Sequence, residues 1–214
     1  MTAAPEHPSA AALRRLRASD PALAAAMKRC GAFPGFPEPA RARGESHFGA
    51  LGRAILFQQL AGKAAATIHK RVCALTPGPR FPRPQDLLAL PEGQLRAAGA
   101  SGAKQAALID LAEHVLDGRL RLAQLARRSD EEIIDGIIQV RGLGVWSAQM
   151  FLMFRLGRLD VLPGNDLGIQ EGLRRLDGLD ERPRPADVLA RGERWAPLRS
   201  VAAWTLWRLT ELSD

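Results

Sequence analysis

The chain has 214 residues, of which 46% are hydrophobic, and 30 Lys and Arg stand against 23 Asp and Glu for a net charge of +7. This hydrophobic content supports one substantial core or two smaller lobes. No stretch approaches the roughly 18 apolar residues that cross a bilayer, which excludes a membrane-spanning helix, and the basic balance favours a polyanionic partner such as nucleic acid.

The first residues are alanine-rich but lack the compact apolar core and cleavage pattern of a secretory signal, and Glu6 and Asp20 argue against a transit peptide. A cytoplasmic location is therefore expected. Cys30 and Cys73 are the only cysteines, so we expect no zinc site and no four-cysteine iron–sulfur cluster. Two thiols are favoured over a disulfide in a reducing compartment.

Helical signals dominate the first half of the chain. Residues 1–17 are expected to form a flexible tail, and 18–214 a single helical domain. Ser19 or Asp20 is the expected N-cap of a helix that stops at Gly31. Ser46 opens a second helix, in which apolar residues recur at helical spacing. A third helix begins near Gly62, after only a short turn.

The second half continues the helical pattern. A helix is expected from about Gly102, another is capped by Ser129 or Asp130, and two more at the end break near Pro197. Segments 31–44, 76–84 and 180–187 are rich in Pro with Gly or Arg and predict loops. No period-two strand pattern stands out, so the predicted fold class is all-α.

The stretch VRGLGVWSAQM (140–150) places Gly142 and Gly144 between a helix that ends near Val140 and a new one. Such glycines permit a tight turn between helices. The amides from Gly142 to Val145 lack intrahelical partners and can bind a phosphate. The alternative is a tight helical corner with glycines for packing, and these residues alone leave both interpretations open.

Three segments in order resemble one family. The Gly-x-Gly hairpin is followed by Pro163 and Asp166, FQQLAGKAAATIHKRV (57–72) precedes it, and RWAPLRSVAAWTLWR (194–208) closes the chain. Together they resemble the helix-hairpin-helix (Gly/Pro, Asp) superfamily of DNA glycosylases, over about Ser46 to Trp207. The resemblance implies two helical lobes with the active-site cleft between them and the helix-hairpin-helix near 130–156.

The position two residues after the second hairpin glycine indicates the branch. Bifunctional members carry there a catalytic lysine, which forms a Schiff base, whereas this chain has Trp146. The chain therefore resembles monofunctional enzymes of the 3-methyladenine DNA glycosylase II (alkylbase) type. Only about 45 residues precede the core, so the resemblance is to a compact form without the extra N-terminal domain of larger relatives.

The resemblance assigns catalysis to Asp166. Glycosidic cleavage passes through a sugar with oxocarbenium character, which a nearby carboxylate stabilises while it orients a water. The alternative is that Asp166 only caps the helix that begins near Leu167. No second acid stands out, which fits a leaving base that N-methylation has already made cationic. A cationic base stacks favourably on aromatic faces.

The resemblance also implies a base pocket formed by Trp146, Trp207, Met150 and Gln58, with Met150 replacing an aromatic residue of larger relatives. Core packing is the alternative for any single tryptophan, and Trp195 and Trp204 stay unassigned. Gln59 and Leu60 lie where the family places its intercalating wedge. For these, the alternative is a polar helix end with Leu60 as a hydrophobic staple.

Phosphate contacts are expected at Gly142, Gly144, Val145, Lys63 and Arg141, although the two charged side chains fit a solvated surface equally well. The resemblance adds a structural monovalent cation that hairpins of this family can hold on main-chain carbonyls, here those of Gln139, Arg141 and Gly144. No side-chain metal site and no required cofactor are expected.

The sequence thus predicts a monomeric, monofunctional DNA glycosylase that flips alkylated bases, such as 3-methyladenine and 7-methylguanine, out of double-stranded DNA and leaves an abasic site. Two alternatives stay open. One is a non-catalytic helix-hairpin-helix DNA-binding module, and the other is a bifunctional glycosylase/lyase that uses Lys63 or Lys104.

Overall fold

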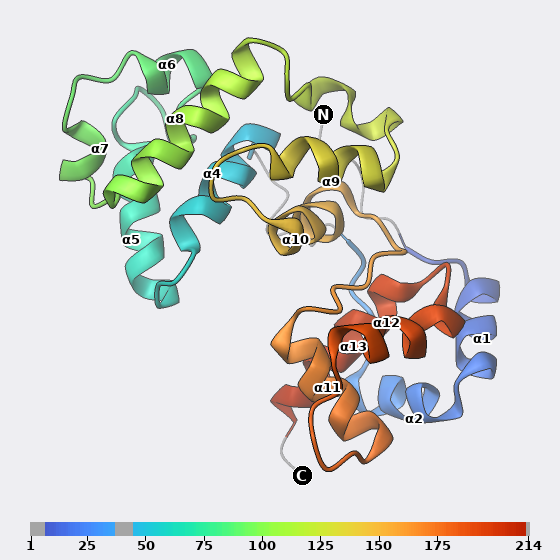
Figure 1. Cartoon of the computed structure of the whole chain (residues 1–214). Coiled ribbons are helices and arrows are strands. Elements are labelled where there is room, and N and C mark those ends of the chain that lie inside the picture. The colour runs from blue at the N-terminus through green and yellow to red at the C-terminus, as the bar shows by residue number, and fades with distance from the viewer. Residues whose placement is uncertain (1–6, 37–44, 213–214) are drawn as a thin grey trace. The chain divides into compact units, whose positions relative to one another are not determined.

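The computed structural model describes residues 7–36 and 45–212 (Figure 1). These residues form helices joined by loops, and no β-strand occurs among them, which confirms the predicted all-α class. The helices of the N-terminal half are α1 (Ala10–Ser19), α2 (Pro21–Cys30), α4 (His47–Phe57), α5 (Gly62–Cys73), α6 (Pro84–Leu88), α7 (Gln94–Ala97) and α8 (Gly102–Leu116). Those that follow are η1 (Leu122–Arg127), α9 (Asp130–Ile138), α10 (Val145–Leu156), α11 (Leu167–Asp177), α12 (Pro185–Gly192), η2 (Glu193–Trp195) and α13 (Arg199–Glu211).

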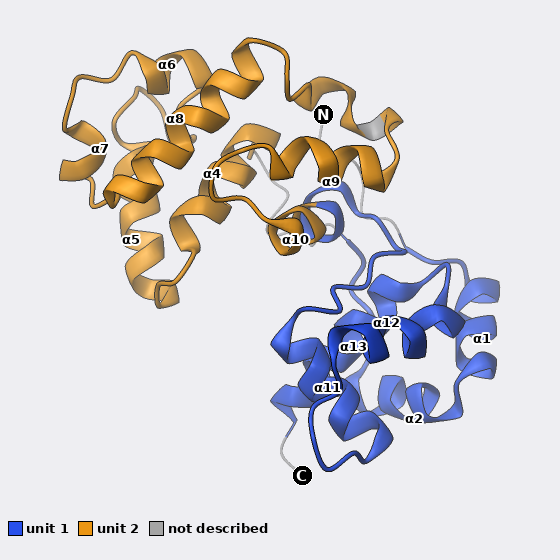
Figure 2. Cartoon of the chain, viewed as in Figure 1, with its two compact units in different colours: residues 1–41, 152–214 blue, residues 42–151 orange. Residues whose placement is uncertain are grey.

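The chain divides into two compact units, and unit 1 is built from both of its ends (Figure 2). Unit 1 comprises residues 1–41 and 152–214, and unit 2 comprises residues 42–151. Each unit buries its own apolar side chains, for example Leu23, Leu173 and Val201 in unit 1 and Leu51, Leu108 and Ile137 in unit 2. The boundary falls within α10, between Phe151 and Leu152.

Helices α11 and α13 form the close-packed centre of unit 1. A Cβ atom at Gly172 would lie 2.3 Å from the Leu206 carbonyl oxygen, and one at Gly168 would lie 2.8 Å from Cδ1 of Trp207. Only glycine permits this approach, because real Cβ atoms do not come closer than about 3.0 Å. The two glycines therefore bring the N-terminal turn of α11 against the indole of Trp207.

A buried charge cluster joins α2 to α12 and η2 in unit 1. Asp20 is 2% exposed, and one of its oxygens accepts hydrogen bonds from Arg191 and from the Trp195 indole. The other oxygen caps α2 through the Leu23 amide. Arg191 also forms a bidentate pair with Asp177 and lies over the Trp195 ring. Asp20, and not Ser19, is therefore the N-cap of α2.

The expected flexible tail over residues 1–17 is wrong for residues 10–17. They belong to α1, whose N-cap Ser9 accepts a hydrogen bond from the Ala12 amide. Leu16 is buried, which ties this helix to the rest of unit 1. Residues 1–6 lie outside the described residues.

Side-chain caps fix the helix starts in unit 2. Ser46 and Ser101 cap α4 and α8, and Ser129 forms a capping box with Glu132 at the start of α9. The N-cap of α9 is therefore Ser129 rather than Asp130. These capped helices support the turn between α4 and α5 and the hairpin between α9 and α10.

Candidate functional site

The predicted hairpin occupies residues 139–144, between α9 and α10. Gly142 has a φ of +77°, a left-handed conformation that favours glycine. Leu143 between the two glycines is buried, and its amide donates to the Val140 carbonyl at 3.0 Å. Gly144 and Val145 are exposed at the start of α10. Anchored by Leu143, the turn presents the first amides of α10 to solvent.

Helix α8 packs against the hairpin and supports it. The Arg141 amide donates to Oδ2 of Asp110 at 2.7 Å, and a Cβ at Gly142 would lie 3.5 Å from Cβ of Ala107. The Arg141 amide is thus committed to Asp110, while its side chain is exposed. The exposed Lys63 lies in the first turn of α5. Phosphate binding by Lys63, Arg141, Gly142, Gly144 and Val145 stays a prediction.

The short turn that connects α4 to α5 contains Gln58, Gln59 and Leu60. Gln59 adopts a φ of +54° and is the one non-glycine residue with positive φ among those described. Gln59 and Leu60 are exposed, Leu60 to 40%. A protruding apolar side chain on a strained turn suits an intercalating wedge, although this role stays a prediction.

Gln58 reaches the hairpin. Its Nε2 donates to the carbonyl oxygen of Gly142 at 2.8 Å. The sequence resemblance implied that this side chain faces the extruded base, and it did not suggest a bond to the hairpin. The observed contact makes Gln58 a link between the turn and the hairpin, both within unit 2.

In unit 1, Asp166 caps α11, as predicted. Its Oδ1 accepts the Ile169 amide at 2.9 Å and the Trp207 indole N–H at 2.8 Å. The side chain is half-buried, so it is neither sealed in the core nor freely solvated. Two donors on one oxygen orient the carboxylate. The residue therefore does more than cap a helix.

Trp207 is held on several sides. Its ring stacks on Phe154 with a centroid separation of 5.7 Å, and Gly168 makes room for its indole edge. A cavity of about 490 Å³ lies beside it, lined by Cys30, Ala32, Phe154, Trp204, Trp207, Arg208 and Glu211. The structure thus brings Trp207 together with Asp166, a contact that the sequence did not predict.

The segment that leads from α10 to Asp166 is fixed by the start of α13. Arg199 forms a bidentate pair with Asp160, with both nitrogen–oxygen distances 2.8 Å. The fully buried Ser200 hydroxyl accepts the Val161 amide at 2.9 Å and donates to the Arg158 carbonyl at 2.8 Å. Arg199 and Ser200 belong to the C-terminal segment that resembles the family, but the sequence did not indicate their role. The structure shows that they hold residues 158–161.

Of the other tryptophans, only Trp146 is strongly exposed, at 46%. It lies one helical turn before the half-buried Met150 on α10, so the two share a helix face. Trp195 is wholly buried and belongs to the core, and the half-buried Trp204 packs edge-on against Phe33. A pocket role for Trp146, Met150 and Gln58 stays a prediction.

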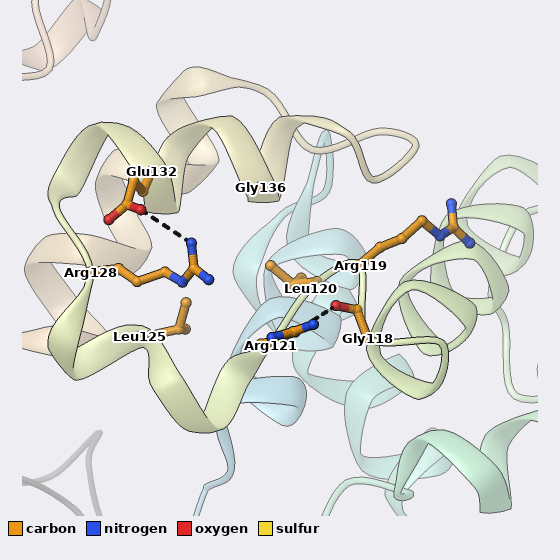
Figure 3. A pocket seen from close by; sticks show the side chains of 8 residues that line it. All are labelled: Gly118, Arg119, Leu120, Arg121, Leu125, Arg128, Glu132 and Gly136. Carbon is orange, nitrogen blue, oxygen red and sulfur yellow. Dashed lines mark hydrogen bonds and ion pairs between the residues drawn. The ribbon is translucent and has the colours of Figure 1, made fainter.

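A further cavity of about 360 Å³ lies in unit 2, at the ends of α8 and η1 and beside α9 (Figure 3). Three of its lining residues are arginines. Arg119 pairs with Asp117 and Arg128 with Glu132, whereas Arg121 donates to the Gly118 carbonyl. Because carboxylates already neutralise two of the three cations, we assign no anion site to this cavity.

No group of three His, Cys, Asp or Glu side chains that could hold a metal ion occurs among the described residues. Cys73 has one such neighbour, His69, at 3.8 Å and four residues earlier, a spacing that sequence reasoning passed over. Of the hairpin carbonyls expected to hold a monovalent cation, that of Gly144 accepts the Ala148 amide at 3.1 Å. The cation stays a prediction, as does the absence of a required cofactor.

Within residues 7–36 and 45–212, no helix combines the length and hydrophobicity needed to cross a bilayer.

Comparison with protein families decides the class of this site. Residues 53–197, which include the turn, the hairpin, Asp166 and Pro197, match the HhH-GPD superfamily of base excision DNA repair proteins. The chain belongs to this superfamily.

Individual members of the HhH-GPD superfamily are similar over most of the chain. DNA-3-methyladenine glycosylase 1 of Schizosaccharomyces pombe is 38% identical over 165 residues, which cover 77% of this chain and 72% of that protein. DNA-3-methyladenine glycosylase 2 of Escherichia coli is 31% identical over 164 residues, 72% of this chain and 55% of that one. The sequence resemblance is thereby confirmed.

Solved structures of the superfamily agree in fold. The 3-methyladenine DNA glycosylase of Schizosaccharomyces pombe in complex with abasic DNA has a TM-score of 0.82 and 32% identity, covering 95% of this chain and 98% of that one. The DNA-3-methyladenine glycosidase of Bacillus halodurans also has a TM-score of 0.82, with 33% identity, covering 92% of this chain and 88% of that one.

Proposed function

We propose that the protein is a monofunctional DNA glycosylase of base excision repair. It hydrolyses the N-glycosidic bond of alkylated bases, of the 3-methyladenine and 7-methylguanine type, and leaves an abasic site. The observation that carries this proposal is the environment of Asp166, a half-buried carboxylate oriented by two N–H donors. Membership of the superfamily and the names of its similar members support the same reaction.

Asp166 acts on the deoxyribose of the extruded nucleotide. The carboxylate stabilises the positive charge that develops on the sugar as the base leaves, and it orients a water for attack at C1′. The Ile169 amide and the Trp207 indole hold one oxygen, Oδ1, so the position of the carboxylate is set before the substrate binds. Such preorganisation lowers the cost of reaching the transition state.

A lyase step is not part of the proposed reaction. Trp146 follows the hairpin where bifunctional members carry a lysine, and an indole cannot form a Schiff base. Lys104, one of the two alternative nucleophiles, donates its Nζ to the Leu56 carbonyl at 2.7 Å and so caps the end of α4. The other, Lys63, is exposed at the start of α5.

Double-stranded DNA is the partner, and the protein acts as a monomer. DNA is held at the hairpin amides and at Lys63, while Leu60 or Gln59 fills the space left by the extruded base. The exposed indole of Trp146 offers an electron-rich face for a cationic methylated purine, an attraction of about 0.5–2 kcal/mol. Positive charge on the base also makes it a better leaving group, which fits a site with one catalytic carboxylate.

The test measures release of free 3-methyladenine from methylated duplex DNA by the wild type and by Asp166→Asn. Asparagine is also a good N-cap, and its side-chain oxygen can accept the same two hydrogen bonds, so the fold is expected to survive. The matched control is Asp187→Asn, because Asp187 is another helix-start carboxylate of unit 1, paired with the exposed Arg184.

We expect release by the wild type and by the control, and none by Asp166→Asn. Equal release by all three proteins would overturn the role of Asp166. DNA binding without release by any of them would favour the non-catalytic module. A covalent protein–DNA adduct trapped by borohydride would favour the bifunctional alternative, and we expect no adduct.

A further inference from the structure

Helix α8 presents one face to both DNA-facing elements of unit 2. At 100° per residue, Lys104 and Asp110 lie within about 60° on either side of Ala107. Lys104 binds the Leu56 carbonyl in the last turn of α4, Ala107 lies beneath Gly142, and Asp110 accepts the Arg141 amide. One helix face therefore holds the end of α4 and the hairpin in a fixed register.

The hydrogen bond from Gln58 to the Gly142 carbonyl closes this arrangement. It joins residues that are 84 positions apart, and it connects the turn directly to the hairpin at 2.8 Å. Gln58 is the C-cap of α4, and the next residue, Gln59, is held at a positive φ. A bond at this point therefore restrains the conformation that lets Gln59 and Leu60 protrude.

We propose that Gln58 is a positioning residue, which couples the turn of residues 58–60 to the hairpin so that phosphate binding and insertion of the turn occur together. The inference rests on the proposed function, because it takes the turn as the wedge and the hairpin as the phosphate grip. It differs from the expected base contact of Gln58: the side chain acts through the protein, and its effect does not need a base in the pocket.

Coupling of this kind is reciprocal. If the bond transmits order from hairpin to turn, DNA bound at the hairpin stabilises the protruding turn, and the inserted turn strengthens the grip of the hairpin. Without the bond, each element binds DNA with its own unrestrained conformations and loses more conformational freedom on binding. We expect the loss with abasic DNA as well, since a wedge formed by the turn would fill the duplex there although no base is present.

The test compares Gln58→Met with the wild type in binding to a duplex that contains a tetrahydrofuran abasic-site analogue. Methionine keeps the length of the side chain and lacks the N–H donor. The matched control is Gln105→Met, because the Gln105 Nε2 also donates to a main-chain carbonyl at 2.8 Å, that of Ala100, on a different face of α8. Hydrogen exchange of segments 57–62 and 139–145 is followed with and without the duplex.

We expect Gln58→Met to bind the abasic duplex at least about fivefold more weakly than Gln105→Met. We also expect faster amide exchange in both segments, while circular dichroism and the melting temperature show that both variants are folded. Equal affinity of the two variants would overturn the proposal. So would a Gln58→Met variant that binds abasic DNA normally but releases a changed ratio of bases, because this pattern identifies a base contact.

The result is separable from the proposed function. Affinity for abasic DNA and hydrogen exchange need no catalysis, whereas release of 3-methyladenine by the wild type reports the glycosylase activity. If the wild type releases no base but Gln58→Met still binds abasic DNA more weakly than Gln105→Met, only the proposed reaction is overturned. Release together with equal abasic affinities of the two glutamine variants would overturn only the coupling.

Discussion

Replacing Gly168 by alanine tests how Asp166 is positioned, with a single methyl group. The added Cβ would lie 2.8 Å from Cδ1 of Trp207 and 3.1 Å from Oδ1 of Asp166, whereas ordinary contact begins at 3.4 Å. To reach the ordinary contact distance of 3.4 Å from the 2.8 Å that the added Cβ imposes, the indole must move by about 0.6 Å. The Trp207 ring also stacks on Phe154, so it cannot withdraw without disturbing that contact.

The expected effect falls on catalysis more than on stability. Alanine is the better helix former by roughly 0.5–1 kcal/mol, which offsets part of the steric cost within α11. A displaced indole weakens or breaks its hydrogen bond to Asp166, and misplacement of a catalytic group by about 1 Å costs up to about a hundredfold in rate. For the Gly168→Ala variant we predict a single-turnover rate about 10- to 100-fold lower.

The assay is single-turnover release of 3-methyladenine, with thermal unfolding measured on the same preparations. Gly136→Ala is the matched control, because Gly136 lies within α9 and its Cβ would make an ordinary contact of 3.4 Å with Leu120. The control should keep the wild-type rate. If Gly168→Ala releases base as fast as Gly136→Ala does, the packing of Trp207 against α11 does not position Asp166.

Three further predictions concern neighbouring contacts. Trp207→Phe keeps the ring stack but removes the N–H that binds Asp166. Because a hydrogen bond to a charged group contributes about 1.5–3 kcal/mol, the single-turnover rate should fall about 10- to 100-fold. An unchanged rate would contradict this role. Ser200→Ala leaves the buried Val161 amide without its acceptor. The free energy of unfolding, measured by urea titration, should therefore fall by about 1–3 kcal/mol. A loss well below about 1 kcal/mol would show that the hydroxyl does not fix residues 158–161. Burial raises the pKa of Asp20, but hydrogen bonds from Arg191, Leu23 and Trp195 outweigh it and leave the pKa below 3.8. Between the lower folded pKa and the unfolded value of 3.8, the unfolded state therefore binds more protons than the folded state. The contribution of Asp20 is fully present well above pH 3.8 and is lost as the pH falls through its folded pKa. The unfolding free energy of Asp20→Asn should depend less steeply on pH in this window, and equal slopes would refute the assignment.

The sequence predicted well those features that local residues determine. Ser46, Ser129 and Asp166 each precede a helix and cap it through an amide three residues ahead, a contact that residue type and spacing indicate. The hairpin was predictable for the same reason, because two glycines in close succession permit a turn that few other residues adopt.

The contacts that position the site were not predictable, because they join distant parts of the chain. Gln58 and Gly142 are 84 residues apart, and Trp207 and Asp166 are 41 apart. No periodicity or spacing rule indicates which amide meets which carbonyl over such separations. The clearest error was local: Ser9 is an ordinary N-cap and the segment after it is rich in alanine, so α1 could have been predicted.

The most direct test of the central claim is the single-turnover rate of 3-methyladenine release by Asp166→Asn, with enzyme in excess of its dissociation constant for the substrate duplex. Saturation removes any difference in DNA affinity, so the rate reports the chemical step alone. A rate at least about a hundredfold below those of the wild type and Asp187→Asn is predicted, because the charge that stabilises the sugar is gone. A rate within about twofold of the wild type would contradict the account, since the reaction would then proceed without this carboxylate.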